Sequence, residues 1–410
     1  MQLFSPTMHI DLFLFLSRIS FYSPHKFIIF EPNNKNNRLM GYNWQLNDWP
    51  RFHYRLREVE PLLFRFSEKA GHVSGLLKGL PKETQNDAII DLMVSEAIKT
   101  SEIEGEYLSR QDIVSSIRNQ LGLGQQQVND LRAQGAAALM VDVRNTFHEA
   151  LTEEKLFSWH RMIMKGSKGI TVGDWRSHEE PMLVISGALG KEKIHFEAPP
   201  SSNVPKEMAG FINWFNETGP GGKKEIKKPV VRAAVAHLYF ETIHPFEDGN
   251  GRIGRALSEK ALSQYLKRPV LLSLSQAIEA NKREYYDALQ KAQRSNEVTS
   301  WIAYFLSMAM QAQEQAERLI DFTLKKTRFF DRYTPLLNER QLKVVRRMLE
   351  EGPKGFEGGM SARKYTALSR TSKATATRDL QDLAEKRVFL STGGGRSTKY
   401  SLNLNDSGEW

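Results

Sequence analysis

The sequence has no cysteine among its 410 residues. Structural disulfides, thiolate metal sites and a cysteine nucleophile are therefore excluded. A chain without disulfides fits a reducing compartment, and we expect a cytoplasmic protein.

Long apolar runs are also missing from the N-terminal region. The apolar stretch at residues 10–16 is too short to span a bilayer and carries Asp11. No basic segment precedes it and no small-residue cleavage site follows it, so it does not resemble a signal peptide. An asparagine-rich break at residues 31–37 separates it from the more regular sequence that follows. We expect residues 1–40 to be a disordered or mis-started extension, and we expect no membrane partner.

Basic residues are concentrated near the C-terminus. Residues 321–400 hold 18 Lys plus Arg against 9 Asp plus Glu, a surplus equal to the net charge of +9 of the whole chain. The rest of the chain is balanced. This distribution indicates a C-terminal module with its own charged surface, attached to a neutral globular part.

One stretch, residues 244–255 (His-Pro-Phe-Glu-Asp-Gly-Asn-Gly-Arg-Ile-Gly-Arg), concentrates chemically useful side chains. Apolar residues recur at helical spacing before and after it, which predicts helix, loop, helix. The glycines on either side of Asn250 allow a tight turn and close approach of a ligand. The helix that follows begins with free N–H groups, and such a helix start binds anions.

The charged side chains of this stretch point to the same chemistry. Arg252 and Arg255 lie one helical turn apart and can both grip a polyphosphate. Asp248 is a hard oxygen ligand suited to Mg²⁺, and His244 can take a proton near neutral pH. Each residue alone has an ordinary explanation as a cap, turn or core residue. Together they indicate a site for a nucleotide phosphate.

The stretch resembles the signature of the Fic family, His-x-Phe-x-Asp/Glu-Gly-Asn-Gly-Arg-x-x-Arg, and fills each of its fixed positions. The resemblance implies that His244 deprotonates a target hydroxyl and that Asp248 holds Mg²⁺ at the α- and β-phosphates of ATP. It implies that the arginines fix the β- and γ-phosphates and that Phe246 anchors the loop. The implied ATP-binding residues of the loop are Asp248, Gly249, Asn250, Gly251, Arg252, Ile253, Gly254 and Arg255.

The implied reaction transfers AMP from ATP to a Ser, Thr or Tyr hydroxyl of a target protein or of the chain itself, with release of pyrophosphate. Relatives that phosphorylate or transfer phosphocholine depart from the signature, which is intact here. Two alternatives stay open. The chain could be a DNA-binding regulator or toxin-like module whose Fic core senses a nucleotide, or a bifunctional enzyme that also removes AMP.

A second segment, residues 100–105, ends a predicted amphipathic helix with two glutamates and a glycine. Carboxylates at a helix C-terminus are mildly unfavourable with the helix dipole, so a distant partner is expected. The segment is similar to the Fic inhibitory motif, Ser/Thr-x-x-x-Glu-Gly/Asn, with Thr100, Glu104 and Gly105 in the fixed positions. That resemblance implies a pair between Glu104 and Arg255 that blocks the place of the ATP γ-phosphate.

Two further segments fit such a core. Met182, Leu183, Val184 and Ile185, followed by residues 194–196, predict a hairpin, which could be a simple edge hairpin. The Fic resemblance implies instead a flap that docks the target as an added strand. Tyr286 follows at the interval at which relatives contact the nucleotide base, and its neighbour Tyr285 must face another way on the same helix.

The basic C-terminal region has helix caps at Asn338, Ser361 and Thr371, then two short strands joined by a glycine turn. Three helices and a hairpin in this order resemble a winged helix-turn-helix. On that interpretation a DNA contact would use Lys373, Thr375, Arg378 and Arg396. The alternative is a surface that docks on a protein.

These patterns together predict a mainly α fold built on a Fic-type helical bundle with a β-hairpin flap. The expected domains are an extension at 1–40, a helical domain with the inhibitory motif at 41–125, a Fic catalytic domain at 126–310, a linker helix at 311–335 and a winged helix-turn-helix at 336–405. The expected small molecules are ATP and Mg²⁺. The expected partners are a hydroxyl-bearing target protein, a second copy in a homodimer, and DNA or protein at the C-terminal module.

Overall fold

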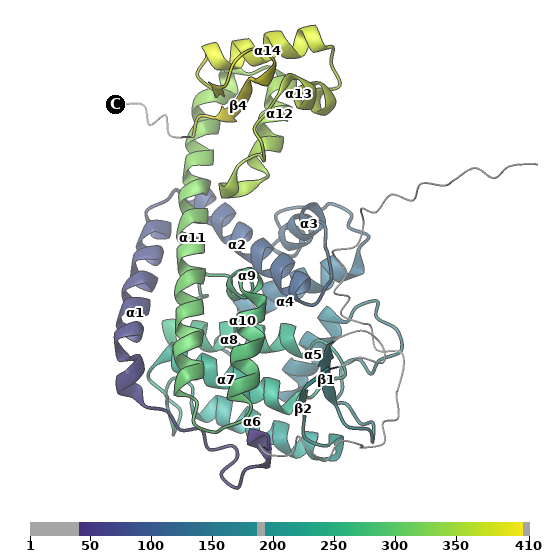
Figure 1. Cartoon of the computed structure of the whole chain (residues 1–410), viewed down its shortest axis with the longest axis vertical. Coiled ribbons are helices and arrows are strands. Elements are labelled where there is room, and N and C mark those ends of the chain that lie inside the picture. Colours follow the sequence, from purple (N-terminus) through teal and green to yellow (C-terminus); the bar gives the residue numbers. More distant parts are fainter. Residues whose placement is uncertain (1–40, 187–192, 405–410) are drawn as a thin grey trace, which may run out of the picture.

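The computed structural model describes residues 41–186 and 193–404 and is mostly helical, with two separate two-stranded hairpins (Figure 1). The predicted mainly α fold is confirmed. The extension predicted at residues 1–40 lies outside the described residues. Among the described residues, no helix is both long and apolar enough to cross a membrane.

The N-terminal part is helical, as predicted. After a short 3₁₀ turn, η1 (Asn43–Gln45), it consists of α1 (Leu56–Lys78), α2 (Lys82–Ile103) and α3 (Arg110–Gln120). Helix α2 is buried along much of its length and reaches deep into the molecule. Its C-terminal end carries the motif at residues 100–105.

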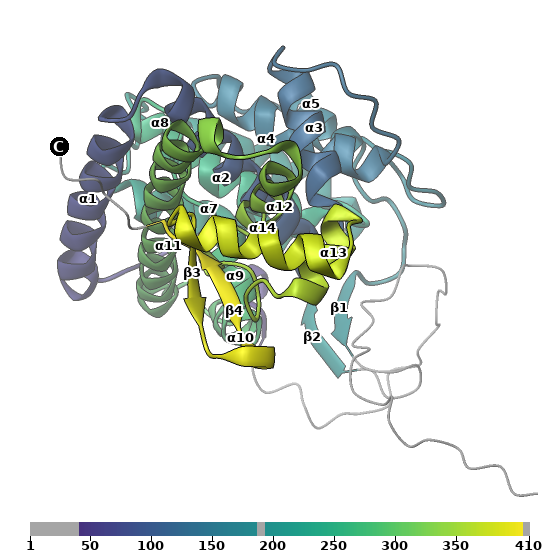
Figure 2. The ribbon, with the colours of Figure 1, turned by 90° about the horizontal axis from the view of Figure 1, so that it is seen from above.

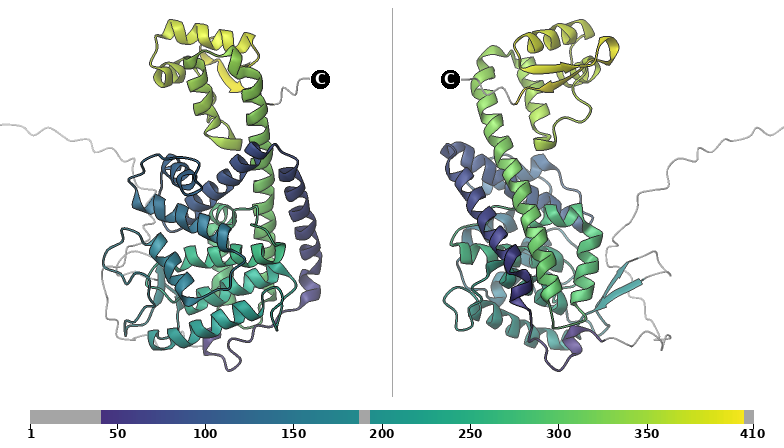
Figure 3. Two further views of the ribbon diagram at one scale, coloured as in Figure 1. Left: turned by 180° about the vertical axis from the view of Figure 1, so that it is seen from behind. Right: turned by 60° about the vertical axis from the view of Figure 1, so that its left-hand side comes forward.

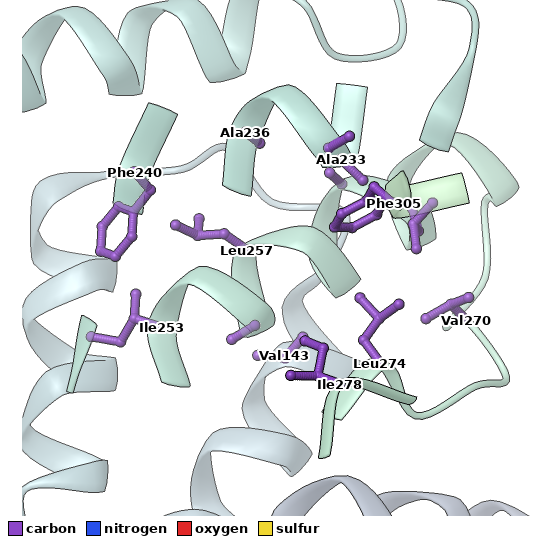
Figure 4. Close-up of a cluster of buried hydrophobic side chains, with 14 of the residues drawn as sticks. Val143, Ala233, Ala236, Phe240, Ile253, Leu257, Val270, Leu274, Ile278 and Phe305 are labelled. Atoms are coloured by element: carbon purple, nitrogen blue, oxygen red, sulfur yellow. The ribbon is translucent and has the colours of Figure 1, made fainter. Parts of the chain in front are cut away.

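The central bundle surrounds one fully enclosed helix. Its elements are α4 (Leu131–Thr146), α5 (Glu153–Ile163), β1 (Leu183–Ser186), β2 (Lys193–Glu197), η2 (Ser201–Asn203), α6 (Val204–Glu217), α7 (Pro229–Ile243), α8 (Asn250–Leu266), α9 (Leu274–Ala280) and α10 (Lys282–Ala292). Helix α7 is buried on every side from Val230 onward, as expected of a central helix that is largely apolar all round. Side chains of α7 and α8, such as Phe240 and Leu257, meet residues of α4, α9 and α11 in the core (Figure 4).

One long helix, α11 (Thr299–Tyr333), connects the bundle to the C-terminal part (Figure 1). Its 35 residues span about 52 Å at 1.5 Å per residue, and its lower half runs beside α1 (Figure 3). The boundary predicted at residue 310 falls inside this helix. Instead of a separate linker helix at 311–335, residues 311–333 are the C-terminal two thirds of α11, because the apolar stripe of α11 continues without a break into the C-terminal core.

The C-terminal part has its own hydrophobic core, to which α11 contributes Phe322, Phe329 and Tyr333. Its elements are η3 (Thr334–Leu336), α12 (Glu339–Leu349), η4 (Gly352–Lys354), α13 (Ala362–Ser369), α14 (Lys373–Glu385), β3 (Phe389–Thr392), η5 (Gly395–Ser397) and β4 (Lys399–Leu402). Three helices followed by an antiparallel hairpin appear in the predicted order (Figure 2).

Two of the three predicted helix caps in this region are confirmed. The side chains of Asn338 and Ser361 accept backbone N–H bonds at the starts of α12 and α13. The prediction of Thr371 as the third cap is wrong by one position. Ser372 takes that role by accepting the N–H of Thr375, three residues later, which is the standard capping distance.

Candidate active site

The stretch at residues 244–255 folds as the predicted helix, loop, helix. Helix α7 ends at Ile243, and His244 closes it in the left-handed conformation with φ of +50°. Helix α8 begins at Asn250, directly after Gly249, whose φ is +82°. The first N–H groups of α8 have no intrahelical acceptors, so the helix start offers the predicted anion-binding backbone.

The loop between the helices is held by side chains that face the protein interior. The Asn250 amide accepts the N–H of Phe246 at 2.9 Å and donates to its carbonyl at 2.8 Å. Phe246 is fully buried, and its ring stacks on His160 with 4.1 Å between centroids. The side chain of Asn250 therefore fixes the conformation of the loop, and the backbone N–H of Asn250 is the group available to a phosphate.

Glycines in the loop and in α8 permit close approaches that a side chain would block. A Cβ at Gly251 would lie 2.5 Å from Oε1 of Glu104, and one at Gly254 would lie 2.4 Å from Oε1 of Glu241. Gly251 thus makes room for the predicted inhibitory glutamate. Ile253, predicted as part of the ATP-binding loop, points its side chain into the hydrophobic core (Figure 4).

The two signature arginines are buried, with 3% and 2% of their side chains exposed, and each meets a carboxylate from the end of α2. A terminal nitrogen of Arg252 lies 3.0 Å from Oε2 of Glu106. A terminal nitrogen of Arg255 lies 2.7 Å from Oε1 of Glu104. Both cations that could hold phosphates are therefore paired within the chain itself.

Arg255 is bound by the motif at more than one point. Its Nε donates to the Thr100 hydroxyl at 2.8 Å, and a terminal nitrogen donates to the Thr100 carbonyl at 3.1 Å. Gly105 adopts a φ of +82° and ends the helix, which turns the chain so that Glu106 comes back towards Arg252. The structure thus brings Thr100, Glu104 and the second signature arginine together at one point.

The charge of Glu104 is maintained by its surroundings. Burial disfavours the ionised carboxylate, but the attraction of Arg255, followed by that of Arg252, outweighs burial and lowers the pKa of Glu104. For Arg255, burial acts against the charge while the carboxylate of Glu104 raises the pKa. The pair is therefore ionised on both sides at neutral pH.

Asp248 lies at the mouth of the loop with 43% of its side chain exposed. One of its oxygens accepts the N–H of Gly249 at 2.6 Å and lies 3.8 Å from Arg252. Within the described residues no cluster of three or more His, Asp or Glu could hold a metal by itself. A single accessible carboxylate next to an anion-binding helix start nevertheless fits Mg²⁺, which is usually held by one or two carboxylates and by substrate phosphates.

His244 is mostly buried, and its imidazole is neutral at neutral pH. Burial, followed by the positive charge of Arg176, lowers the pKa of His244 to about 4. Its Nδ1 lies 3.7 Å from Oε2 of Glu241, a carboxyl whose pKa burial raises to about 8. Glu241 is therefore protonated at neutral pH, and the imidazole is free to accept a proton.

The remaining predicted positions fall in two places. Leu183, Val184 and Ile185 form β1, with Met182 just before it, and β1 pairs antiparallel with β2 beside the bundle (Figure 2). The turn predicted between the strands lies outside the described residues. Tyr285 packs inward with its hydroxyl 2.7 Å from Nε2 of His237, and Tyr286 is partly buried beside it, as the opposite facing of neighbours requires.

The predicted DNA-contacting residues lie in the C-terminal part, above the bundle in Figure 1. Lys373 and Arg378 are exposed on α14. The Thr375 hydroxyl lies 3.0 Å from the hydroxyl of the capping Ser372, so it serves the helix start. The side chain of Arg396 lies outside the described part of the chain.

Four residues that the sequence analysis did not single out shape this site: Glu106, His160, Arg176 and Glu241. His160 bridges the loop and the segment before β1, since its Nε2 lies 3.1 Å from the Asp248 carbonyl and its Nδ1 accepts the N–H of Gly173. Glu106 had a signal in the sequence, namely a second carboxylate two positions after Glu104. The fold brings the other three to the site, and no motif in the sequence marks them.

Comparisons with known proteins agree with the position of this site. Residues 150–262 match the family described as Fic/DOC, and residues 42–123 match a domain of unknown function, DUF4172. A protein adenylyltransferase Fic of Nematostella vectensis is 25% identical over 50% of this chain and 40% of its own length. A probable protein adenylyltransferase of Aquifex aeolicus is 32% identical over 35% of this chain and 38% of its own length.

The chain thus spans less than half the length of these two relatives. Among solved structures, a Fic family protein from Desulfovibrio desulfuricans is 19% identical, with a TM-score of 0.49 over 84% of this chain and 96% of that one. The family match covers the loop from His244 to Arg255, with α7 and most of α8 on either side of it. The part of the chain from residue 150 to residue 262, which holds this site, is thus similar to the Fic/DOC family.

Proposed function

We propose that the chain is a protein adenylyltransferase that moves AMP from ATP to a hydroxyl side chain of a protein. The observation that carries the proposal is the loop from His244 to Arg255, where a neutral buried base stands next to a helix start and two buried arginines. The relatives named as adenylyltransferases support it. Buried cations and a base with a displaced pKa are typical of a site that binds and transfers a phosphoryl group.

In this mechanism the target hydroxyl loses its proton to His244 while its oxygen bonds to the α-phosphorus of ATP. The bond from the α-phosphorus to the bridging oxygen of the β-phosphate breaks, and pyrophosphate leaves. With Nδ1 of His244 carrying the ring N–H and donating to the backbone of Glu241, Nε2 is the nitrogen that takes the proton. The backbone N–H groups at the start of α8 and the signature arginines bind the phosphates.

Asp248 is the residue that would hold Mg²⁺, which when bound neutralises phosphate charge. Among the described residues, the flap strand β1 pairs only with β2, and the other edge of such a strand can align a target segment by backbone hydrogen bonds. Tyr286 is the proposed contact to the nucleotide base. Removal of AMP by the same site, with Glu104 orienting a water molecule, stays a second prediction for this active site.

We further propose that the end of α2 restrains this activity. Glu104 binds Arg255 where an incoming γ-phosphate would bind it, and a charge-assisted pair has to be given up before a triphosphate sits productively. A hydrogen bond to a charged group contributes about 1.5–3 kcal/mol, which corresponds to about a 10- to 150-fold effect. Removing the Glu104 carboxylate should therefore raise AMP transfer within that range.

The test compares the wild type, Glu104→Gly and Glu104→Gly/His244→Ala, each incubated with ATP and Mg²⁺ alone and with host lysate. Intact-mass and peptide mass spectrometry then look for proteins that gain one AMP. We expect labelling by the Glu104→Gly chain and loss of that labelling in the double variant. If the Glu104→Gly chain adds no AMP to any protein, the proposed function is overturned. If it transfers a phosphate instead of AMP, the chain is a protein kinase and not an adenylyltransferase.

A further inference from the structure

Arg176, three residues after the left-handed turn at Gly173, is a buried cation with no carboxylate partner among the described residues. Only 1% of Arg176 is exposed, and within the described residues no carboxylate lies in salt-bridge range of it. Its guanidinium donates to neutral oxygens, at 2.8 Å to the His244 carbonyl, 2.8 Å to the Ser201 hydroxyl, 2.6 Å to the Pro199 carbonyl and 3.2 Å to the Ile243 carbonyl. Burying an unpaired charge costs stability, and these acceptors offset part of that cost.

The bonds of Arg176 converge on the backbone that presents the base. The Arg176 side chain holds the carbonyls of Ile243 and His244, and its backbone N–H donates to the Pro245 carbonyl at 2.9 Å. Three consecutive carbonyls are thus bound by one residue. His244 has a φ of +50°, a conformation that costs energy for a residue other than glycine and persists only when its surroundings fix it.

The same side chain also reaches the segment that follows the flap. Pro199 and Ser201, its other acceptors, come directly after β2, which ends at Glu197. The neighbouring Trp175 packs its ring on Phe246 with 5.0 Å between centroids. Residues 175–176 therefore connect the catalytic loop on one side and the base of the flap on the other.

Three charged or titratable groups act on His244 from the elements around it. Arg176 faces it from the segment before β1, Glu241 from α7, and Glu104 from the end of α2. The positive charge of Arg176 stays beside the base in every state of the site. The carboxylate of Glu104, in the proposed mechanism, is displaced from Arg255 when ATP binds. A change at Arg176 should therefore alter both the placement and the proton affinity of His244.

We propose that Arg176 is a positioning residue for the AMP transfer reaction, and that its side chain holds the left-handed turn at His244 against the base of the flap. This inference rests on the proposed function and adds a residue outside the signature. Charge and geometry make separable contributions. Lysine at position 176 keeps the charge but cannot reproduce the fork of donors, and methionine removes both.

The experiment introduces Arg176→Lys and Arg176→Met into the full-length Glu104→Gly chain and records AMP transfer as a function of ATP concentration and pH. A displaced base loses about 10²-fold in kcat, and we expect that loss for Arg176→Met with KM for ATP within threefold of the parent. Removing the positive charge should shift the acidic limb of kcat to higher pH. Arg176→Lys should lower kcat by about 10-fold and leave the acidic limb in place, because the charge remains.

Arg232 provides a matched control. It is also 1% exposed, its pKa is likewise lowered to about 10 by burial, and it also donates to neutral groups, including the Phe215 carbonyl at 2.7 Å. It lies on α7 about 18 Å along the helix axis from His244. Arg232→Met should lower the melting temperature as Arg176→Met does, while kcat per folded molecule and the acidic limb stay at the parent values.

A measurement that does not depend on activity separates the positioning role of Arg176 from the proposed function of the chain. Histidine-edited NMR on the full chain should show the pKa of His244 rising in Arg176→Met and remaining in place in Arg232→Met and Arg176→Lys. If Arg176→Met does not fold, Arg176→Lys decides through its kcat. An active parent with Arg176 variants within twofold in kcat and with an unmoved acidic limb would overturn the positioning role, whereas an inactive parent with a shifted His244 pKa would overturn the proposed function alone.

Discussion

Two arginine–carboxylate pairs, one in the bundle and one in the C-terminal part, bury opposite partners. In the bundle the cation is inside, since Arg255 is 2% exposed and Glu104 reaches it with 26% of its side chain exposed. In the C-terminal part the anion is inside, since Asp379 is 9% exposed while Arg340 keeps 42% exposed. A buried cation can exchange its carboxylate for an incoming phosphate, whereas a buried anion offers nothing to an anionic ligand.

The partners left behind also differ. Without Arg340, Asp379 still accepts the Tyr365 hydroxyl at 2.9 Å, so its burial remains satisfied in part. Without Glu104, the acceptors that Arg255 keeps within the described part of the chain are the neutral oxygens of Thr100, which do not compensate its charge. The Arg255–Glu104 pair is therefore suited to exchanging its carboxylate for a phosphate. The Arg340–Asp379 pair is suited to stabilising the fold of the C-terminal part. The following predictions test this difference, in order of decreasing effect.

The largest effect should come from His244, the base of the proposed transfer. In the Glu104→Gly chain, His244→Ala should lower AMP transfer by about 10²–10⁴-fold, the usual contribution of a general base. Thermal melting should change little. If the double variant transfers AMP at a rate within threefold of the Glu104→Gly chain, His244 is not the base. The Arg255–Glu104 pair would then not regulate a site that uses His244.

Removing the buried anion of the C-terminal part should affect stability alone. Asp379→Ala deletes the bonds to Arg340 and Tyr365 and should destabilise this part by about 2–3 kcal/mol, measured by denaturant unfolding. AMP transfer by the Glu104→Gly chain should not change when Asp379→Ala is added. A loss of transfer would show that the C-terminal core supports the active site, and the two pairs would no longer be independent.

A smaller effect is expected at Glu106, whose carboxylate occupies the first signature arginine. Glu106→Gln keeps the shape and removes the charge from the pair with Arg252 at 3.0 Å. We expect AMP transfer to rise by about 10-fold, and further when combined with Glu104→Gln, because a second charged bond no longer competes with phosphate. A variant that transfers at the wild-type rate would limit the restraint to Glu104.

The smallest effect is expected for the exposed basic side chains on α14. If the C-terminal part binds DNA, Lys373→Ala and Arg378→Ala should each weaken binding of a short duplex at low salt and each reduce the salt slope by about 1. AMP transfer should not change. Duplex binding that is absent from the wild type even at low salt would favour a protein partner for this surface.

The sequence predicts the fold class and the signature loop well because both depend on local patterns. Helix periodicity places α7 and α8, and the glycines on either side of Asn250 place the turn between them. The end of the helix at Gly105 is also local, and so is the second carboxylate at Glu106. Features that depend on spacing within one loop, such as the turn at residues 249–251, are therefore predictable from the sequence.

What the sequence does not predict are those contacts across the fold that no recognised motif marks. The bonds from Arg176 to the carbonyls around His244 join positions 68 residues apart, and nothing in the pattern near either residue marks them. The continuous helix α11 was divided at residue 310 because its apolar stripe serves two cores in succession. Capping at Ser372 instead of Thr371 shows that two adjacent hydroxyl residues compete for one role, and the backbone decides between them.

The most direct test of the exchange at Arg255 measures AMP incorporation by the wild type, Glu104→Gly and Asp379→Ala, at equal protein, ATP and Mg²⁺ concentrations. Glu104→Gly should exceed the wild type by about 10- to 150-fold, and Asp379→Ala should stay within twofold of it. Equal incorporation by the wild type and Glu104→Gly, at a measurable rate, would contradict the account, because the carboxylate on Arg255 would then place no restraint on the site.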